Sequence, residues 1–431
     1  MKELVDVIIT VNSPGEVSGW LKPVSVALEH LPWESRITVF IPPCPFASGA
    51  ETEVVKEIPQ VDKVIGAKET IRLILTGKRP KGFYPSGCGV VLFLGGDLTY
   101  AAFLGKRLHY PAVAYTEGLV NWERSFARFA LPYHYMVEKI KNNLIKKKTR
   151  VIGNLMLDAV KPGFSKEKMK QILGNQGSPG LLLMPGSRPA HFHYMLVFFL
   201  KAAEKIKNQI SDLIPAVSIS PFVSEQQLIE SLSSSMAKSW KLSAVYIPGE
   251  DKKTSLEWQS HGQIKTSSGV SIPCFRGHQY DLMNWADLAL TIPGTNTIEL
   301  SFMGVPMIVT VPLNHPEEIP LEGIAGIIGE IPVLGKKLKK RLLPKVLAKI
   351  KFTAWPNRLA GELVTPELIG ELSPDEVAET AVDMLKDRTG LFNITKRLQE
   401  AVGEQGAAQR LADLLQEVVK EYYENKDLNK R

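Results

Sequence analysis

The residues with the clearest capacity for chemistry lie in one stretch, 287–312. Two apolar runs there predict buried strands, one ending near 292 and the other at 307–311, and the segment 295–303 predicts a helix after a Pro-Gly turn. In an open parallel sheet this order places the helix N-terminus at the carboxyl edge of the strands, where unpaired amide N–H groups favour an anion. The stretch therefore predicts a phosphate site.

The side chains around this turn suit a nucleotide diphosphate. Gly294 permits close approach of the backbone, and Thr295 and Thr297 supply short hydroxyls. Asn296 lies between the threonines, and Glu299, one turn into the helix, can accept hydrogen bonds from both hydroxyls of a ribose. The alternative is an ordinary strand–helix–strand unit whose Pro-Gly is only a turn and whose glutamate is solvated. The stretch by itself does not separate the two.

A second candidate loop follows the apolar run 5–11, which predicts the first strand. Its candidate substrate-binding residues are Gly15, Glu16 and Ser18. The glycines do not form the GxGxxG pattern of a nicotinamide-dinucleotide site, so we expect the loop to face a substrate instead.

An aspartate follows the predicted strand 90–94 after two glycines. Because glycine gives little steric cover, Asp97 is suitably placed for a general base. A lone aspartate is more often the N-cap of a helix, and a helix is expected from about 99. The next predicted strand, 112–115, delivers Glu117 and Asn121 to the same edge, where they are secondary candidates for holding an acceptor.

The run 180–184 predicts a strand that enters a turn carrying Gly186, Ser187 and Arg188. An arginine at a helix start can bind a diphosphate by charge and fork geometry together, although a surface arginine fits the pattern as well. His191 and His193 lack a third ligand of suitable spacing, so no metal site is predicted.

Two α/β halves must position these loops. Strand-like runs alternate with helical or loop stretches on both sides of a polar, glycine-containing linker at 163–180, as in parallel sheets. We expect an acceptor-side Rossmann-like domain at 1–162, a nucleotide-binding Rossmann-like domain at 163–372 and a helical tail at 373–431 that packs back across them. Two such domains facing each other across a cleft form the GT-B glycosyltransferase fold. The chain has no Asp-x-Asp, the usual metal site of the single-domain alternative.

The composition is that of a globular protein, with 431 residues, 44% hydrophobic and 23% charged. The N-terminus carries acids where a signal peptide would be basic, and no apolar run approaches the ~18 residues of a spanning helix. Cys44, Cys88 and Cys274 are isolated from one another, which suits a reducing compartment. A cytoplasmic location is expected.

The net charge of +7 is local, because eight Lys or Arg and no acid lie within 336–351. An apolar, glycine-rich segment at 319–334 precedes them. Such a pair predicts peripheral contact of 319–351 with an anionic membrane, where each basic group contributes roughly 1 kcal/mol. A solvated loop and helix is an equal alternative. No nucleic-acid-binding signature is present, so no nucleic-acid partner is expected, and the oligomeric state is open.

In chain order, these motifs resemble those of the lipid-A-disaccharide synthases, a GT-B glycosyltransferase family. Residues 15–19 are similar to the family's "GE-x-SG" loop, residues 152–158 to its "Val-Gly-His-Pro-Leu-x-Asp" step, and residues 184–188 to its "Leu-Pro-Gly-Ser-Arg" turn. Residues 293–307 are similar to its "Ser-Gly-Thr-x-Thr-Leu-Glu … Gly-x-Pro-Met" unit, and residues 356–369 to its "Pro-Asn-x-Leu-Ala-Gly-Arg … Pro-Glu-Leu" segment. Asn357 joins the candidate binding residues through the last of these.

The resemblance implies an inverting, metal-independent transfer of an acylated amino sugar from UDP to a lipid-linked acceptor, with no cofactor besides the UDP-sugar substrate. Arg188, Thr295, Thr297 and Glu299 would hold UDP, and Asp97 would accept the proton of the acceptor hydroxyl. Trp20, Glu362 and the loop 116–122 depart from the family's pattern, and Asp97 follows Gly-Gly where the family has Pro-Asp-Phe-Asn. The departures lie mostly on the acceptor side, so the acceptor is expected to differ from that of lipid A synthesis.

Two other hypotheses remain. An enzyme resembling UDP-GlcNAc 2-epimerase would use the same fold but would need no second substrate. A non-catalytic GT-B protein would bind nucleotide or lipid without turnover.

Overall fold

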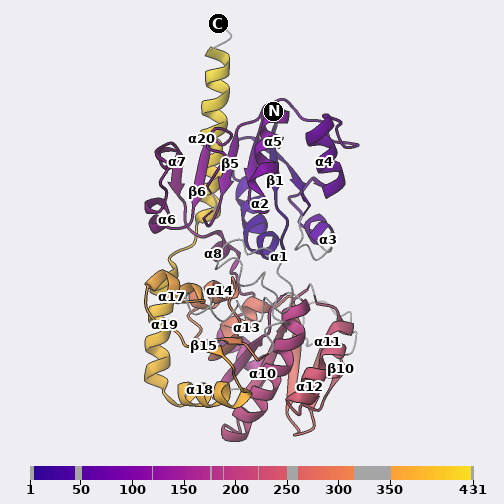
Figure 1. Cartoon of the computed structure of the whole chain (residues 1–431), viewed down its shortest axis with the longest axis vertical. Helices are drawn as coiled ribbons and strands as arrows, with labels where there is room; N and C mark the ends of the chain where they lie inside the picture. Colours follow the sequence, from indigo (N-terminus) through magenta and orange to yellow (C-terminus); the bar gives the residue numbers. More distant parts are fainter. Residues whose placement is uncertain are drawn as a thin grey trace. The chain divides into compact units, whose positions relative to one another are not determined.

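The computed structural model describes residues 4–43, 51–118, 120–174, 177–187, 189–221, 223–249, 261–314 and 351–428. The chain forms two compact units, one made of Met1–Ala159 with Glu404–Arg431 and the other of Val160–Gly403. Each unit is built on its own sheet covered by helices (Figure 1). The prediction of two Rossmann-like α/β domains is confirmed.

The first unit has a seven-stranded, wholly parallel sheet in the order β3-β2-β1-β4-β5-β6-β7. Thr10 of β1 pairs with Phe93 of β4, so the loops that leave these two central strands start side by side. The strands are β1 Leu4–Thr10, β2 Glu34–Phe40, β3 Lys63–Ile65, β4 Gly89–Phe93, β5 Ala112–Tyr115, β6 Arg128–Leu131 and β7 Thr149–Val151.

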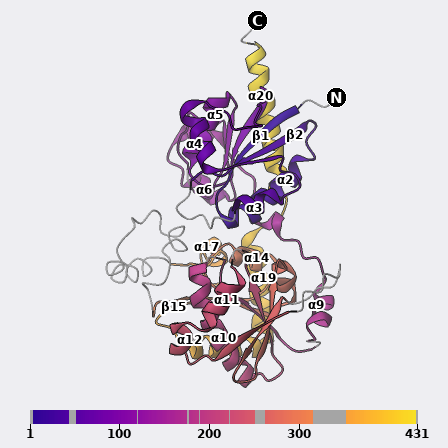
Figure 2. The same cartoon turned by 90° about the vertical axis from the view of Figure 1, so that its right-hand side faces the viewer.

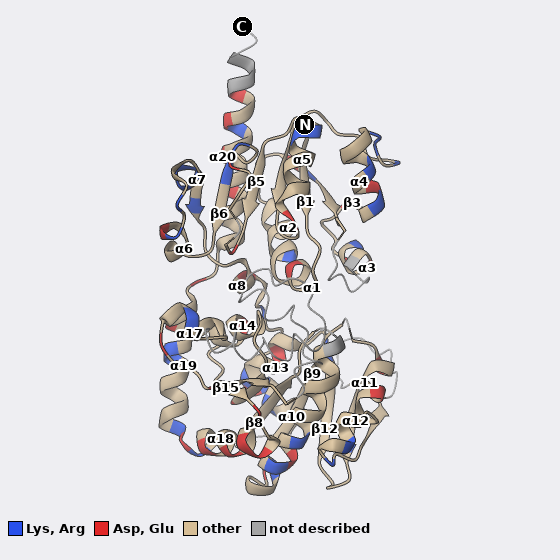
Figure 3. Cartoon of the chain, in the orientation of Figure 1, with Lys and Arg blue, Asp and Glu red and all other residues tan. Residues whose placement is uncertain are grey.

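Helices connect these strands, and one element among them is a π-helix, η1 (Val17–Leu21). The others are α1 Pro14–Glu16, α2 Lys22–Leu28, α3 Glu51–Lys56, α4 Ala67–Thr76, α5 Leu98–Leu108, α6 His134–Glu138, α7 Asn143–Lys148, α8 Leu155–Ala159 and α20 Ala407–Leu428. Lys and Arg gather on α7, whose last turn contains three lysines (Figure 3).

The helix α20, from the far end of the chain, completes the core of the first unit. Its buried residues Ala407, Leu411, Leu415 and Val418 recur at the spacing of one helix face and join the cluster formed by the β1 and β4 side chains. Asp158 caps this helix across the sequence by accepting hydrogen bonds from Gly406 N and Ala408 N, each at 2.5 Å.

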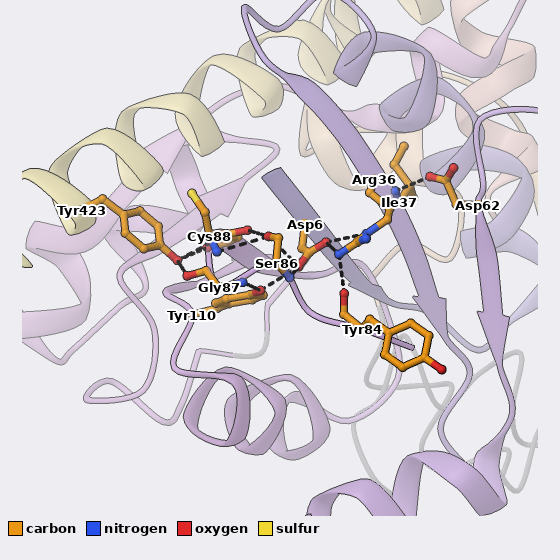
Figure 4. Close-up of polar contacts among 11 residues, drawn as sticks. Asp6, Arg36, Ile37, Asp62, Tyr84, Ser86, Gly87, Cys88, Tyr110 and Tyr423 are labelled. Carbon is orange, nitrogen blue, oxygen red and sulfur yellow. Dashed lines mark hydrogen bonds and ion pairs between the residues drawn. The ribbon is translucent and has the colours of Figure 1, made fainter. Parts of the chain in front are cut away.

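A buried carboxylate, Asp6, lies near the amino end of β1 and is 2% exposed. One of its oxygens accepts from Arg36 Nε at 2.8 Å, and the other accepts from Ser86 N, Ser86 Oγ and Tyr110 Oη at 2.6, 3.0 and 2.7 Å (Figure 4). On the same edge, Tyr423 of α20 accepts from Gly89 N at 2.9 Å. These donors satisfy Asp6 within the protein, as a buried charge requires.

The second unit has an eight-stranded sheet in the order β10-β11-β12-β9-β8-β13-β14-β15. Two neighbouring pairs in this sheet, β10–β11 and β11–β12, are antiparallel. The other neighbouring pairs are parallel. The strands are β8 Gly180–Met184, β9 Ile214–Ile219, β10 Ala244–Pro248, β11 Gly262–Thr266, β12 Ser271–Arg276, β13 Leu288–Thr291, β14 Met307–Pro312 and β15 Glu367–Gly370.

Two apolar clusters cover the two faces of this sheet. Helix α10 contacts both α11 and α18 on one face, and α10 and α11 lie side by side in Figure 2. The helices described in this unit are α9 Lys166–Leu173, α10 Pro189–Gln209, α11 Glu225–Leu232, α12 Ser235–Ser239, α13 Gln279–Trp285, α14 Asn296–Phe302, α17 Trp355–Ala360, α18 Pro374–Lys386 and α19 Arg388–Val402.

Three details differ from the sequence expectations. Four strands, β3, β6, β11 and β15, are not among those expected from the sequence. The segment 163–180, expected to be a polar linker, contains α9, which Ser165 caps and which ends at Gly174 in the left-handed conformation. The chain of the helical tail also divides between the units, because α18 and α19 belong to the second unit and α20 to the first.

Candidate functional site

The loops after β1 and β4 pack directly against each other at the carboxyl edge of the first sheet. Glu16 Oε2 accepts hydrogen bonds from Asn12 N at 3.1 Å and Ser13 N at 3.0 Å. A Cβ on Gly95 would overlap the Glu16 carboxyl, and one on Gly96, whose φ is +88°, would lie 2.5 Å from Asn12 Nδ2. Only glycine therefore allows this approach.

The environment of Glu16 is unusual for a carboxylate. Burial raises its pKa above the ordinary value, while hydrogen bonds from the amides of Asn12 and Ser13 act in the opposite direction. The residue ends α1 and leads into the π-helix η1, a geometry found frequently at functional sites. Gly15 and Ser18 flank it and are partly exposed.

Asp97, which follows Gly96 in the loop after β4, is exposed and caps α5. Its Oδ1 accepts a hydrogen bond from Thr99 N at 2.8 Å. The cap uses one carboxylate oxygen and fixes the direction of the side chain, so a cap and a proton acceptor are compatible roles for one residue.

The loop after β5 places Glu117 and Asn121 differently. Glu117 is partly buried, and Asn121 is exposed. Burial raises the pKa of Tyr115, and the charge of Glu117 adds to this rise. Glu117 therefore interacts with the interior of the first unit, whereas Asn121 is available to solvent.

In the second unit, the turns after β8 and β13 meet. Gly186 has a φ of +103°, and a Cβ there would lie 2.7 Å from Ile292 Cδ1. Ser187 is exposed at the same turn. Arg188 lies outside the described residues. The nearby His193 Nδ1 is 3.2 Å from Ser231 Oγ, and the described part of the chain contains no cluster of side chains able to hold a metal.

Around α14 the candidate residues separate into two kinds. Thr297 is fully buried, donates to Gly294 O at 2.8 Å and accepts from Trp355 N at 3.3 Å, so its hydroxyl is used by the fold. Asn296 donates to Thr291 Oγ1. Thr295, in contrast, is exposed at the start of the helix.

Glu299 is the candidate with the most perturbed carboxyl. Burial raises its pKa to about 7, against the effect of a hydrogen bond from Tyr280 Oη to Oε1 at 3.0 Å. No other hydrogen bond to this carboxyl comes from the described residues. A carboxyl held by a single neutral donor retains acceptor capacity for a ligand. The sequence reasoning missed Tyr280, although its place just after β12, at the same carboxyl edge, was a usable signal.

Asn357 has a different environment. It is fully buried, and its amide donates to Thr365 O at 2.8 Å and Glu367 Oε1 at 2.7 Å. Its carbonyl accepts from Val364 N at 2.7 Å and Thr365 N at 2.9 Å. The side chain thus makes all four of its hydrogen bonds within the second unit and holds the turn that precedes β15.

The segment expected to contact a membrane, 319–351, lies outside the described residues except for its last residue. Within the described ranges, no helix has the length and apolarity that crossing a bilayer requires.

Comparisons with solved structures identify the class of fold. At 12% identity, UDP-GlcNAc 2-epimerase from Neisseria meningitidis bound to UDP-GlcNAc superposes with a TM-score of 0.53, covering 97% of this chain and 100% of that one. CalG4, the calicheamicin glycosyltransferase, gives the same TM-score and identity over 97% and 99% of the chains. The fold is therefore the two-domain one shared by GT-B glycosyltransferases and such epimerases.

Sequence comparison narrows the class. Residues 141–257 match the family model described as lipid-A-disaccharide synthetase. The lipid-A-disaccharide synthase of Gluconobacter oxydans is 27% identical over 254 residues, which are 56% of this chain and 48% of that protein. The chain spans about half the length of the curated relatives it matches. The resemblance to the lipid-A-disaccharide synthases, predicted from the motifs, is confirmed at low identity.

Proposed function

We propose that the protein is a glycosyltransferase that moves an amino sugar, acylated or not, from a UDP-sugar to a lipid-linked acceptor, with inversion and without a metal. Reaction at the cytoplasmic face of the membrane is part of the same proposal. The similarity to lipid-A-disaccharide synthases supports the reaction class.

The observation that carries the proposal is the Glu299 carboxyl. It lies in the first turn of α14, just beyond the carboxyl end of β13, and its described partners leave one oxygen available. Ribose hydroxyls that donate to it would favour its ionised form and replace the water lost on burial. The proposed donor site therefore consists of Glu299 and Thr295 with the turn at Gly186, Ser187 and Arg188.

Asp97 is the proposed base. The acceptor hydroxyl gives its proton to the Asp97 carboxylate as its oxygen bonds to the anomeric carbon. The bond from that carbon to the diphosphate breaks on the opposite face, and UDP leaves with the electron pair. Arg188 is the proposed cation that stabilises the charge developing on UDP.

Asp97→Asn tests this assignment, because asparagine is also a good N-cap and should preserve α5. We expect turnover to fall by about 10²–10⁴-fold while UDP affinity is unchanged. Asp62→Asn is the matched control, since Asp62 is another exposed aspartate of the first unit that accepts one backbone N–H, from Ile37 at 2.7 Å. Unchanged turnover in Asp97→Asn would refute the assignment of the base.

A panel of UDP-sugars, assayed by thermal shift and by product formation with lipid-linked acceptors, tests the function as a whole. Absence of binding to UDP and to every UDP-sugar refutes it. Conversion of UDP-GlcNAc to its C2 epimer without a second substrate would show the epimerase alternative, which has the same fold. UDP binding without turnover on any acceptor would support the alternative of a non-catalytic nucleotide-binding protein.

A further inference from the structure

Two aromatic rings are exposed together on the first unit, between α5 and the loop that follows β5. Phe103 and Trp122 lie edge to face with their ring centroids 5.7 Å apart. Each residue is 40% exposed. Large aromatic residues are usually buried to a greater extent, so this pair presents an unusual amount of apolar surface to solvent.

The backbone at Trp122 is held in an unfavourable conformation. Its φ is +59°, in the left-handed region that bulky residues rarely adopt. Its carbonyl accepts a hydrogen bond from Ser125 N at 2.8 Å. Lys148 Nζ fixes the next residues by donating to Glu123 O at 2.7 Å and Phe126 O at 2.8 Å. Strain that the surrounding structure enforces is typical of ligand-binding positions.

The position of the pair relates it to Asp97, the cap of α5. Phe103 lies six residues further along the same helix, which corresponds to roughly 9 Å at 1.5 Å per residue. Asn121 precedes Trp122 and is exposed, so an amide capable of both donating and accepting is adjacent in sequence to the aromatic pair. A hexopyranose matches this combination, because its C–H groups form an apolar face and its hydroxyls form a polar rim.

We propose that Phe103 and Trp122 form the platform on which the sugar ring of the acceptor lies, with Asn121 bonding to its hydroxyls. The inference rests on the proposed function, in which the acceptor must reach Asp97. A sugar fits better than an acyl chain because an acyl chain requires a continuous apolar groove. Among the described residues of α5 and 120–127, only these two large hydrophobic side chains are exposed.

The test uses N-acetylglucosamine 1-phosphate as the sugar probe and decyl phosphate as the acyl probe, with saturation-transfer NMR and titration on the full chain. We expect Trp122→Ala to weaken binding of the sugar probe about tenfold and Trp122→Phe to change it less than about threefold. Phe103→Leu, which keeps apolar volume but removes the ring, should fall between them. Phe392→Leu, at a 70% exposed phenylalanine of the second unit, is the control and should change nothing.

Trp122→Gly guards against misfolding, because glycine accepts the positive φ without strain. Wild-type affinity for the sugar probe in both Trp122→Ala and Trp122→Gly overturns the inference, as does dependence on Trp122 for decyl phosphate alone. UDP binding is measured separately on each variant. A protein that binds the sugar probe through Trp122 but no UDP refutes the proposed function and supports the platform. Turnover that does not change when Trp122 is replaced supports the proposed function and refutes the platform.

Discussion

Asp6 is a buried carboxylate and Glu299 a partly buried one, and they differ in what surrounds them. Asp6 receives hydrogen bonds from Arg36, Ser86 and Tyr110, through both of its oxygens. Glu299 receives one, from the neutral hydroxyl of Tyr280, and burial raises its pKa to about 7. Incomplete satisfaction is costly for folding, so a carboxyl in that condition is a candidate for binding a ligand. A saturated one serves the fold.

The largest effect is expected for Asp6→Asn. Loss of the charge leaves Arg36 with a neutral partner, and we expect the free energy of unfolding to fall by about 3 kcal/mol. This is the lower end for a broken buried pair, because a third of the Arg36 side chain is exposed. Urea denaturation measures it. Glu53→Gln, which removes an exposed pair with Lys56, is the control and should cost less than about 1 kcal/mol. Equal losses in the two variants would contradict the distinction.

Glu299→Gln should weaken UDP binding without lowering stability, because it removes a carboxyl whose charged form burial disfavours. We expect UDP affinity to fall about tenfold to a hundredfold, as for the loss of hydrogen bonds to a charged acceptor. Calorimetric titration measures it. Asp6→Asn should leave UDP affinity unchanged wherever the protein remains folded, and the opposite result would remove the distinction between the two carboxylates.

The pH dependence of the two properties should run in opposite directions. Folding raises the pKa of Glu299 from 4.5 to about 7, so the folded state binds more protons across this range. Its contribution therefore lowers stability as pH rises from 4.5 to 7. UDP affinity should instead increase through pH 7, because the ribose binds the ionised carboxylate. Glu299→Gln should flatten both profiles, and an unchanged affinity profile would exclude Glu299 as the ribose acceptor.

A smaller effect is expected for Gly95→Ala, which concerns a third, partly buried carboxylate, Glu16. The added methyl group overlaps the Glu16 carboxyl, and we expect about 1–3 kcal/mol of destabilisation with reduced turnover. Gly66→Ser is the matched control, since Gly66 has a φ of −76° and an N-cap position that serine favours, and a Cβ added there would meet nothing within 4 Å. Thermal unfolding and acceptor turnover, measured on both variants, check the prediction.

The sequence predicted which edge of each sheet carries the candidate residues, because parallel strands bring the loops that follow them to one edge. It did not reveal which carboxylates are satisfied. Asp6 lies within an apolar strand, and its partners are 30 to 104 residues away. The contact between Glu16 and Gly95 depends on the register of β1 against β4. Strand β11 was missed because its segment is polar and pairs antiparallel. Asn357 resembles a binding residue in sequence, although all its hydrogen-bonding capacity is used within the fold.

Helix α20 also determines when the first unit can finish folding. A ribosome releases the strands of that unit first, yet Leu411 and Leu415, which cover them, emerge only after all of 160–403 has been made. Until then the nascent sheet carries an uncovered apolar face. Completion of the first unit is therefore deferred until α20 has been made, and the second unit is the one that can fold first.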